Sequence, residues 1–163
     1  VTGADNVVAW RTGYPFGVNL ARGYPRFNPG EYTASDVLAR GEADAAIIIA
    51  SDPMANFSEP ARQHLKSIPY IAFDPKETPT TRDAEVAFTV ATYGINVPGT
   101  VYRMDDIPIP LRPAFDCHHP SDLEILQGIE KRVQELIALE VPANEENSSL
   151  RPARESTNGS VTE

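Results

Sequence analysis

The middle of the chain alternates short apolar runs with amphipathic segments. Three apolar runs, at residues 45–50, 68–73 and 86–90, each have the length of a β-strand. The first run contains no charge and no alternation of polar and apolar residues. This pattern predicts a strand that is buried on both faces, with helices above and below the sheet.

Helices are predicted before and between these strands. Thr33 or Ser35 can cap a helix that extends to about Ala39, and Gly41 can stop it. A second helix is expected at about residues 58–66, where a Ser-Glu-Pro sequence opens an amphipathic stretch. The order of helix, strand, helix and strand with short connections predicts an α/β fold with a parallel sheet.

The two ends of the chain differ from this middle part. Residues 1–31 are rich in Gly, Pro and aromatic side chains and are predicted to be loops, and so is the stretch at 93–113. We place an α/β domain at residues 1–116, an amphipathic helical segment at 117–140, and a tail that is disordered or bound to a partner at 141–163. Because the sequence opens without Met, we expect a fragment, a processed chain or half of a split polypeptide.

Composition and charge narrow the classes of function. The 163 residues carry a net charge of −9, which argues against a general nucleic-acid surface and against an anionic membrane surface. No apolar run approaches the roughly 20 residues of a membrane span. The only cysteine, Cys117, excludes an internal disulfide framework and a self-contained thiolate metal site. This cysteine usage is typical of a cytoplasmic protein.

Polar residues follow two of the predicted strands. Ser51-Asp52-Pro53 comes after the first strand and Asp74-Pro75 after the second, so both are expected at one edge of the sheet, where parallel sheets bind ligands. The hydroxyls of Thr78, Thr80 and Thr81 follow closely. They can contact a sugar–phosphate ligand, or they can cap a short helix, and the sequence leaves both alternatives open.

Other reactive side chains have weaker patterns. Arg22 and Arg26 flank a Gly-Tyr-Pro sequence and either bind an anion or pair with some of the 23 acidic residues. His64 lies on a predicted helix and is expected to be a surface residue or one with satisfied hydrogen bonds, and not a metal ligand. Cys117-His118-His119 lacks the second pair of ligands of a zinc site, so we expect no metal site in this chain unless another subunit shares it.

Four stretches resemble motifs of the cofactor-binding domain of the molybdopterin oxidoreductase superfamily. Residues 1–7 resemble the end of an Asn-Val-x-Gly motif, and residues 49–53 resemble a Gly-x-Asn-Pro turn. Residues 74–86 follow the spacing Asp-x-x-x-Thr-x-Thr-x-x-x-Ala-x-Val, and residues 99–105 resemble a Glu-x-x-Gly-Thr stretch with its continuation. The Gly-Tyr-Pro and Ala-Ser-Asp-Pro sequences are similar to the C-terminal portion of the B subunit of the formylmethanofuran dehydrogenases. Asn96 and Asp106 depart from the motifs, which usually carry Glu and Gly there.

This resemblance implies a Rossmann-like domain that binds a tungsten or molybdenum pyranopterin guanine dinucleotide. The family interconverts carbon dioxide and formate, and formate passes to another subunit that condenses it with methanofuran. The implied partners are the remainder of the B subunit and the other subunits, which carry any iron–sulfur clusters. The segment with the metal ligand would precede Val1, so the isolated chain is expected to be inactive.

The resemblance also implies which residues hold the dinucleotide. Asp74 would accept hydrogen bonds from guanine or ribose, and Arg22 is a possible active-site residue. The full set of implied cofactor-binding residues is Gly3, Ser51, Asp52, Pro53, Asp74, Thr78, Thr80, Thr81, Gly99 and Thr100. Two other interpretations stay open: a scaffold subunit of a formyltransferase/hydrolase complex without the metal cofactor, and a central domain like those of thiamine-diphosphate enzymes.

Overall fold

The computed structural model describes the backbone of residues 2–148 and the side chains of residues 3–139. The chain divides into two compact units, Val1–Asp122 and Leu123–Glu163. The first unit mixes helices and strands, and the described part of the second is helical. The predicted α/β class with a C-terminal helix is therefore confirmed.

A three-stranded parallel sheet forms the centre of the first unit. It consists of β3 (Ala46–Ile49), β4 (Tyr70–Asp74) and β5 (Val86–Thr89), in the order β3-β4-β5. Both pairings are parallel, as predicted from the alternating order of helices and strands. The carboxyl ends of the three strands therefore lie at one edge of the sheet.

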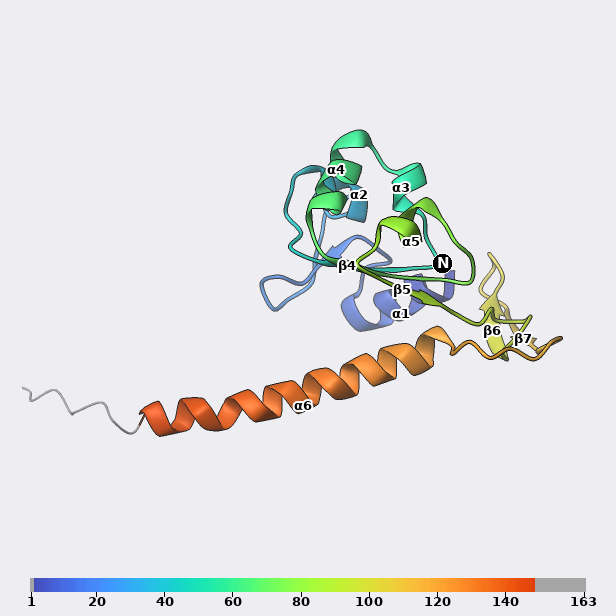
Figure 1. Ribbon diagram of the computed structural model, residues 1–163. Coiled ribbons are helices and arrows are strands. Elements are labelled where there is room, and N and C mark those ends of the chain that lie inside the picture. The colour runs from blue at the N-terminus through green and yellow to red at the C-terminus, as the bar shows by residue number, and fades with distance from the viewer. Residues whose placement is uncertain (1, 149–163) are drawn as a thin grey trace, which may run out of the picture. The chain divides into compact units, whose positions relative to one another are not determined.

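Four helices lie on one side of this sheet (Figure 1): α2 (Ala34–Ala39), α3 (Pro53–Asn56), α4 (Glu59–Ser67) and α5 (Pro79–Asp83). The predicted cap of α2 is present, because the Thr33 hydroxyl accepts a hydrogen bond from the Asp36 amide at 3.3 Å. Gly41 follows α2 with φ of +69°, which a residue with a side chain rarely adopts. The core between α2, α4 and the sheet contains Leu38, Ala61, Leu65, Tyr70 and Ala72, all buried.

The opposite face of the sheet is partly open, which corrects the prediction of helices on both faces. Ile47 is 55% exposed, Ile49 is 40% exposed and Val86 is 43% exposed. Successive side chains of a strand point to opposite faces, so the helices cover Ile48 but leave these residues uncovered. An uninterrupted apolar run indicates a strand that is apolar on both faces, but it does not indicate that residues of the same chain cover both faces.

Four short strands and one helix occur where loops were predicted. Helix α1 (Thr2–Thr12) has no apolar stripe, so its sequence offered no helical periodicity. The strands β1 (Val18–Asn19) and β2 (Arg26–Phe27) form an antiparallel pair, and so do β6 (Gly99–Tyr102) and β7 (Pro108–Leu111). The prolines of β7 argued against a strand, because proline has no backbone N–H to donate. In a two-stranded sheet, however, each strand has one edge that pairs with no other strand, and no N–H donor is needed there.

The second unit contains helix α6 (Asp122–Ser148). We expected the helical segment to end at about residue 140, but the backbone of the helix continues beyond Pro142 to Ser148. The rest of the predicted tail, 149–163, lies outside the described residues. Within the described part of the chain, no helix is both long enough and apolar enough to cross a membrane.

Candidate functional site at the carboxyl edge of the sheet

The chain turns sharply where β3 ends. Ala50 has φ of +50°, in the left-handed region that costs a residue with a Cβ about 1–2 kcal/mol. Its amide donates to the carbonyl oxygen of Phe73 on β4 at 2.9 Å, which holds the turn against the neighbouring strand. In the Gly-x-Asn-Pro motif that this stretch resembles, glycine occupies the position of Ala50. The backbone conformation therefore agrees with the motif even though the side chain differs.

Asp52 joins the end of β3 to the start of α5. Its Oδ1 accepts hydrogen bonds from the Thr80 hydroxyl at 2.5 Å and from the Thr80 amide at 3.3 Å. The same hydroxyl accepts from the Met54 amide at 3.1 Å, and Thr80 is completely buried. Pro53 is buried at the first position of α3. Asp52, Pro53 and Thr80 thus position the two loops that leave β3 and β4.

Thr78 and Thr81 cap helix α5. The Thr78 hydroxyl accepts from the Thr81 amide at 3.1 Å, and the Thr81 hydroxyl accepts from the Thr78 amide at 2.8 Å, which makes a reciprocal capping box. Of the two alternatives that the sequence left open for these hydroxyls, capping is the one visible in the structure. Any contact between them and a ligand stays a prediction.

Asp74 ends β4 with a largely buried carboxylate. It is 8% exposed, and its Oδ1 accepts from the Lys76 amide at 3.0 Å, which closes a tight turn. A polar hollow of about 300 Å³ opens beside it at the carboxyl ends of β4 and β5. The hollow is lined by Asp74, Lys76, Glu77, Thr81, Arg82, Ala87, Phe88 and Thr89.

Six of the eight residues that line this hollow were not among the predicted site residues, and three of the six, Lys76, Arg82 and Thr89, add cationic or hydroxyl groups. Thr89 lies next to Asp74 in the register between β4 and β5, and the prediction of adjacent parallel strands could have found it. Lys76 and Arg82 supply positive charge, although Arg82 also pairs with Glu77 at 3.0 Å. The hollow therefore offers carboxylate, hydroxyl and cationic groups together, which are the groups that recognise a nucleotide.

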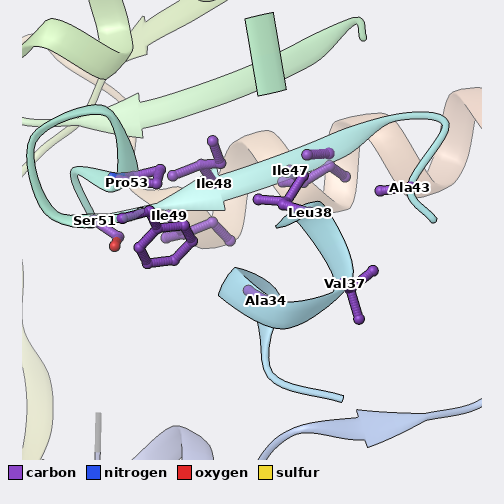
Figure 2. Close-up of a pocket in the computed structure, with 11 residues that line it drawn as sticks. Ala34, Val37, Leu38, Ala43, Ile47, Ile48, Ile49, Ser51 and Pro53 are labelled. Atoms are coloured by element: carbon purple, nitrogen blue, oxygen red, sulfur yellow. The ribbon is translucent and has the colours of Figure 1, made fainter. Parts of the chain in front are cut away.

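The other predicted site residues do not line this hollow. Ser51 lies at the end of β3 and lines a separate, apolar hollow (Figure 2). Gly99 and Thr100 belong to β6, and a Cβ added at Gly99 would lie 2.8 Å from Cδ1 of Tyr93. A Cβ at Gly3 in α1 would lie 3.1 Å from Cδ2 of Tyr102. Close packing is thus a sufficient reason for both glycines.

The remaining candidate side chains make contacts within the fold or are exposed at the surface. Arg26 donates to the Tyr32 hydroxyl at 3.2 Å and to Asn19 Oδ1 at 2.9 Å, whereas Arg22 is exposed. His64 Nε2 lies 2.8 Å from the carbonyl oxygen of Ala43, as expected for a satisfied histidine. Cys117 accepts from the His119 amide at 3.3 Å. Among the described residues, no group of three or more His, Cys, Asp or Glu side chains could hold a metal ion.

Tyr70, at the start of β4, and the partly buried Asp122 have shifted pKa values. Burial, followed by the charge of Asp83, raises the pKa of Tyr70 to about 12, and its hydroxyl donates to the Thr80 carbonyl oxygen at 2.9 Å. Burial also raises the pKa of the Asp122 carboxyl, and the nearby charge of Asp74 raises it further. The carboxylates of Asp74 and Asp122 therefore lie close enough to repel each other.

Comparison with known proteins gives curated relatives and a solved structure. The chain is 50% identical over 139 residues to the B subunit of the tungsten-containing formylmethanofuran dehydrogenase 2 of Methanocaldococcus jannaschii. It is 44% identical over 138 residues to the protein of the same name from Methanococcus maripaludis. These alignments cover 84% and 83% of this chain but 32% of each relative, so the chain spans about a third of their length. No protein-family profile matches the chain.

One structural neighbour is a chain of the crystal structure of the formyltransferase/hydrolase complex from Methylorubrum extorquens in complex with methylofuran. The match has a TM-score of 0.66 and 25% sequence identity, and it covers 83% of this chain and 38% of the neighbour. It supports the fold, and the sequence identities to the curated relatives are much higher. Most of this chain is therefore homologous to about one third of the B subunit of the tungsten-containing formylmethanofuran dehydrogenases.

Proposed function

We propose that this chain forms part of the B subunit of a formylmethanofuran dehydrogenase and binds the guanine dinucleotide of its tungsten or molybdenum pterin cofactor. The assembled enzyme would interconvert carbon dioxide and formate, together with the remainder of that subunit and the other subunits. The family relationship to two tungsten-containing enzymes supports this proposal.

The observation that carries the proposal is the polar hollow at the carboxyl ends of β4 and β5. Parallel sheets bind nucleotides at this edge, because backbone groups that the sheet no longer pairs point outward there. The hollow contains Asp74, which is a position of the sequence motif, and Thr81, which was predicted as a further hydroxyl contact. The Asp52–Thr80 hydrogen bonds keep the adjoining loop fixed against α5, so the site is organised before a ligand binds.

The donors and acceptors fit the nucleoside end of such a cofactor. The Asp74 carboxylate can accept from guanine N–H groups or from ribose hydroxyls, and Lys76 can offset the charge of a nearby phosphate. The metallopterin, when bound, supplies the two-electron redox chemistry. The described residues of this chain would only bind and orient it, and they include no set of metal ligands.

A second function is favoured by the structural neighbour. The formyltransferase/hydrolase complex contains a chain with this fold, so a scaffold role without metal or dinucleotide is the competing proposal. The identity of 44–50% to dehydrogenase subunits, against 25% to the neighbour, favours the dehydrogenase.

The two proposals differ in what the purified complex contains. The complex that forms around this chain would be isolated and analysed for tungsten, molybdenum and acid-released guanine nucleotide, and for formate-dependent dye reduction. The dehydrogenase proposal predicts a metal, a guanine nucleotide and dye reduction in the complex, with none of this activity in the isolated chain. A complex that lacks both metal and guanine nucleotide yet transfers formyl groups would establish the scaffold role instead.

A further inference from the structure

Within the described residues, the outer edge of β3 is unpaired and entirely apolar, which is unusual for a strand edge. Among the described strands β3 pairs with β4 alone, so its other edge presents backbone donors and acceptors without a strand partner. The edge consists of Ala46 and the three isoleucines Ile47, Ile48 and Ile49. Exposed edges normally carry a charge, a proline or a bulge that prevents pairing with another strand, and this edge has none of them.

An apolar hollow of about 290 Å³ runs along this edge (Figure 2). All four residues of β3 line it, from both faces of the strand, together with residues of α2 such as Val37 and Leu38. No residue of β4 contributes. The hollow therefore lies beside the strand, where the side chain of a neighbouring segment would sit.

The apolar surface continues from this edge across the open face of the sheet. Ile47 lines the edge hollow and also a second one of about 600 Å³, which extends past Ile71 to Val86 on β5. Both hollows are mainly apolar, with Glu85 as the only charged residue lining the second. The uncovered surface thus reaches from one side of the sheet to the other.

We propose that the part of the subunit outside this chain's aligned third covers this surface. An apolar, extended segment would pair with the free edge of β3 as a further strand and place a side chain in the edge hollow. The curated relatives are about three times as long as the match, so they contain enough additional chain. This inference rests on the family relationship and not on the proposed cofactor site.

A second copy of this chain is the less suitable occupant. Pairing of two β3 edges would join two strands of four residues each and would leave the hollow beside Val86 uncovered. Covering the edge and the face together needs a larger surface, as in permanent interfaces. A covalently linked segment also binds at a high effective concentration.

Thiol labelling tests the proposal. The chain would replace the 139 aligned residues in the Methanocaldococcus jannaschii protein, with Cys117→Ser and a single new thiol from Ile49→Cys. We expect this thiol to react about tenfold more slowly in the monodisperse chimera than in the isolated chain, because covered residues react only after local opening. Gln63→Cys, on the exposed side of α4, is the control and should react at similar rates in both.

Equal labelling of the residue-49 thiol in both proteins would overturn the proposal. Slow labelling in the isolated chain would overturn it as well. A dimeric mass would then indicate that a second copy covers residue 49, and a monomeric mass would indicate that another segment of the same chain covers it. If the chimera aggregates, the isolated chain would be co-expressed with the remaining Methanocaldococcus jannaschii polypeptide. The wild-type chain should then co-purify with it and the Ile49→Lys variant should not, and any other result contradicts the proposal.

Discussion

Thr80 connects the ends of two strands through one buried hydroxyl. Thr80→Val keeps the shape of the side chain but removes the donor to Asp52 and the acceptor for the Met54 amide. We expect a loss of about 1–3 kcal/mol in the free energy of unfolding, because buried polar groups lose their partners. Thr80→Ser keeps the hydroxyl and should cost only about 1 kcal/mol for the lost methyl group. Denaturant unfolding of the two variants measures the difference, and equal losses would show that the hydroxyl contributes nothing.

Asp122 makes the free energy of unfolding depend on pH. Burial and the charge of Asp74 raise its pKa, and its Oδ1 is buried without a hydrogen-bond partner among the described residues. A carboxyl with a raised pKa in the folded state stabilises the fold at low pH. This contribution is lost as pH rises from the unfolded value near 3.8 through the raised folded value.

Asp122→Asn removes this titration. The melting temperature of the variant relative to the wild type should therefore be higher at pH 7 than at pH 3. Thermal unfolding at the two values measures the difference, and the other titrating groups cancel because both proteins contain them. A difference that is the same at both pH values, or smaller at pH 7, would rule out a shifted Asp122.

At the scale of elements, Gly99 determines how closely β6 approaches the preceding turn. A Cβ there would lie 2.8 Å from the ring of Tyr93, closer than real side chains come. Gly99→Ala should lower the free energy of unfolding by about 1–3 kcal/mol through overpacking. In a Tyr93→Ala background the same change should cost about zero, since the ring is gone. A cost that is unchanged in that background would show that contact with the Tyr93 ring is not its cause.

The sequence predicted those elements whose signals are local. The strands β3, β4 and β5 followed from apolar runs, their parallel order from the helices between them, and the α2 cap from Thr33. Helix α1 lacks an apolar stripe and β7 contains prolines, so neither carried the expected pattern. For Thr78 the sequence offered two roles, and only the distances to Thr81 showed that it caps a helix.

At the scale of the whole chain, two observations concern how the sheet is covered and how much of the relatives is matched. Its sheet has helices on one face and an open apolar surface on the other, and its sequence matches one third of its relatives. The carboxyl edge of the sheet could be located from sequence because strand order determines it. Its lining residues Lys76 and Arg82 could not, because their approach to Asp74 depends on the turn and on α5.

Asp74→Asn separates the two roles of the carboxylate at this edge. The asparagine side-chain oxygen can still accept from the Lys76 amide, so the turn should be preserved and the melting temperature should not fall. A bond between the carboxylate and guanine would become weaker by roughly 1.5 kcal/mol, which is about tenfold in cofactor retention. Acid-released guanine nucleotide per assembled complex, in wild type and variant, is the most direct measurement. We expect guanine nucleotide in the wild-type complex and a marked loss in Asp74→Asn at a melting temperature no lower than that of the wild type, whereas full guanine content in the variant would contradict the assignment of this edge as the dinucleotide site.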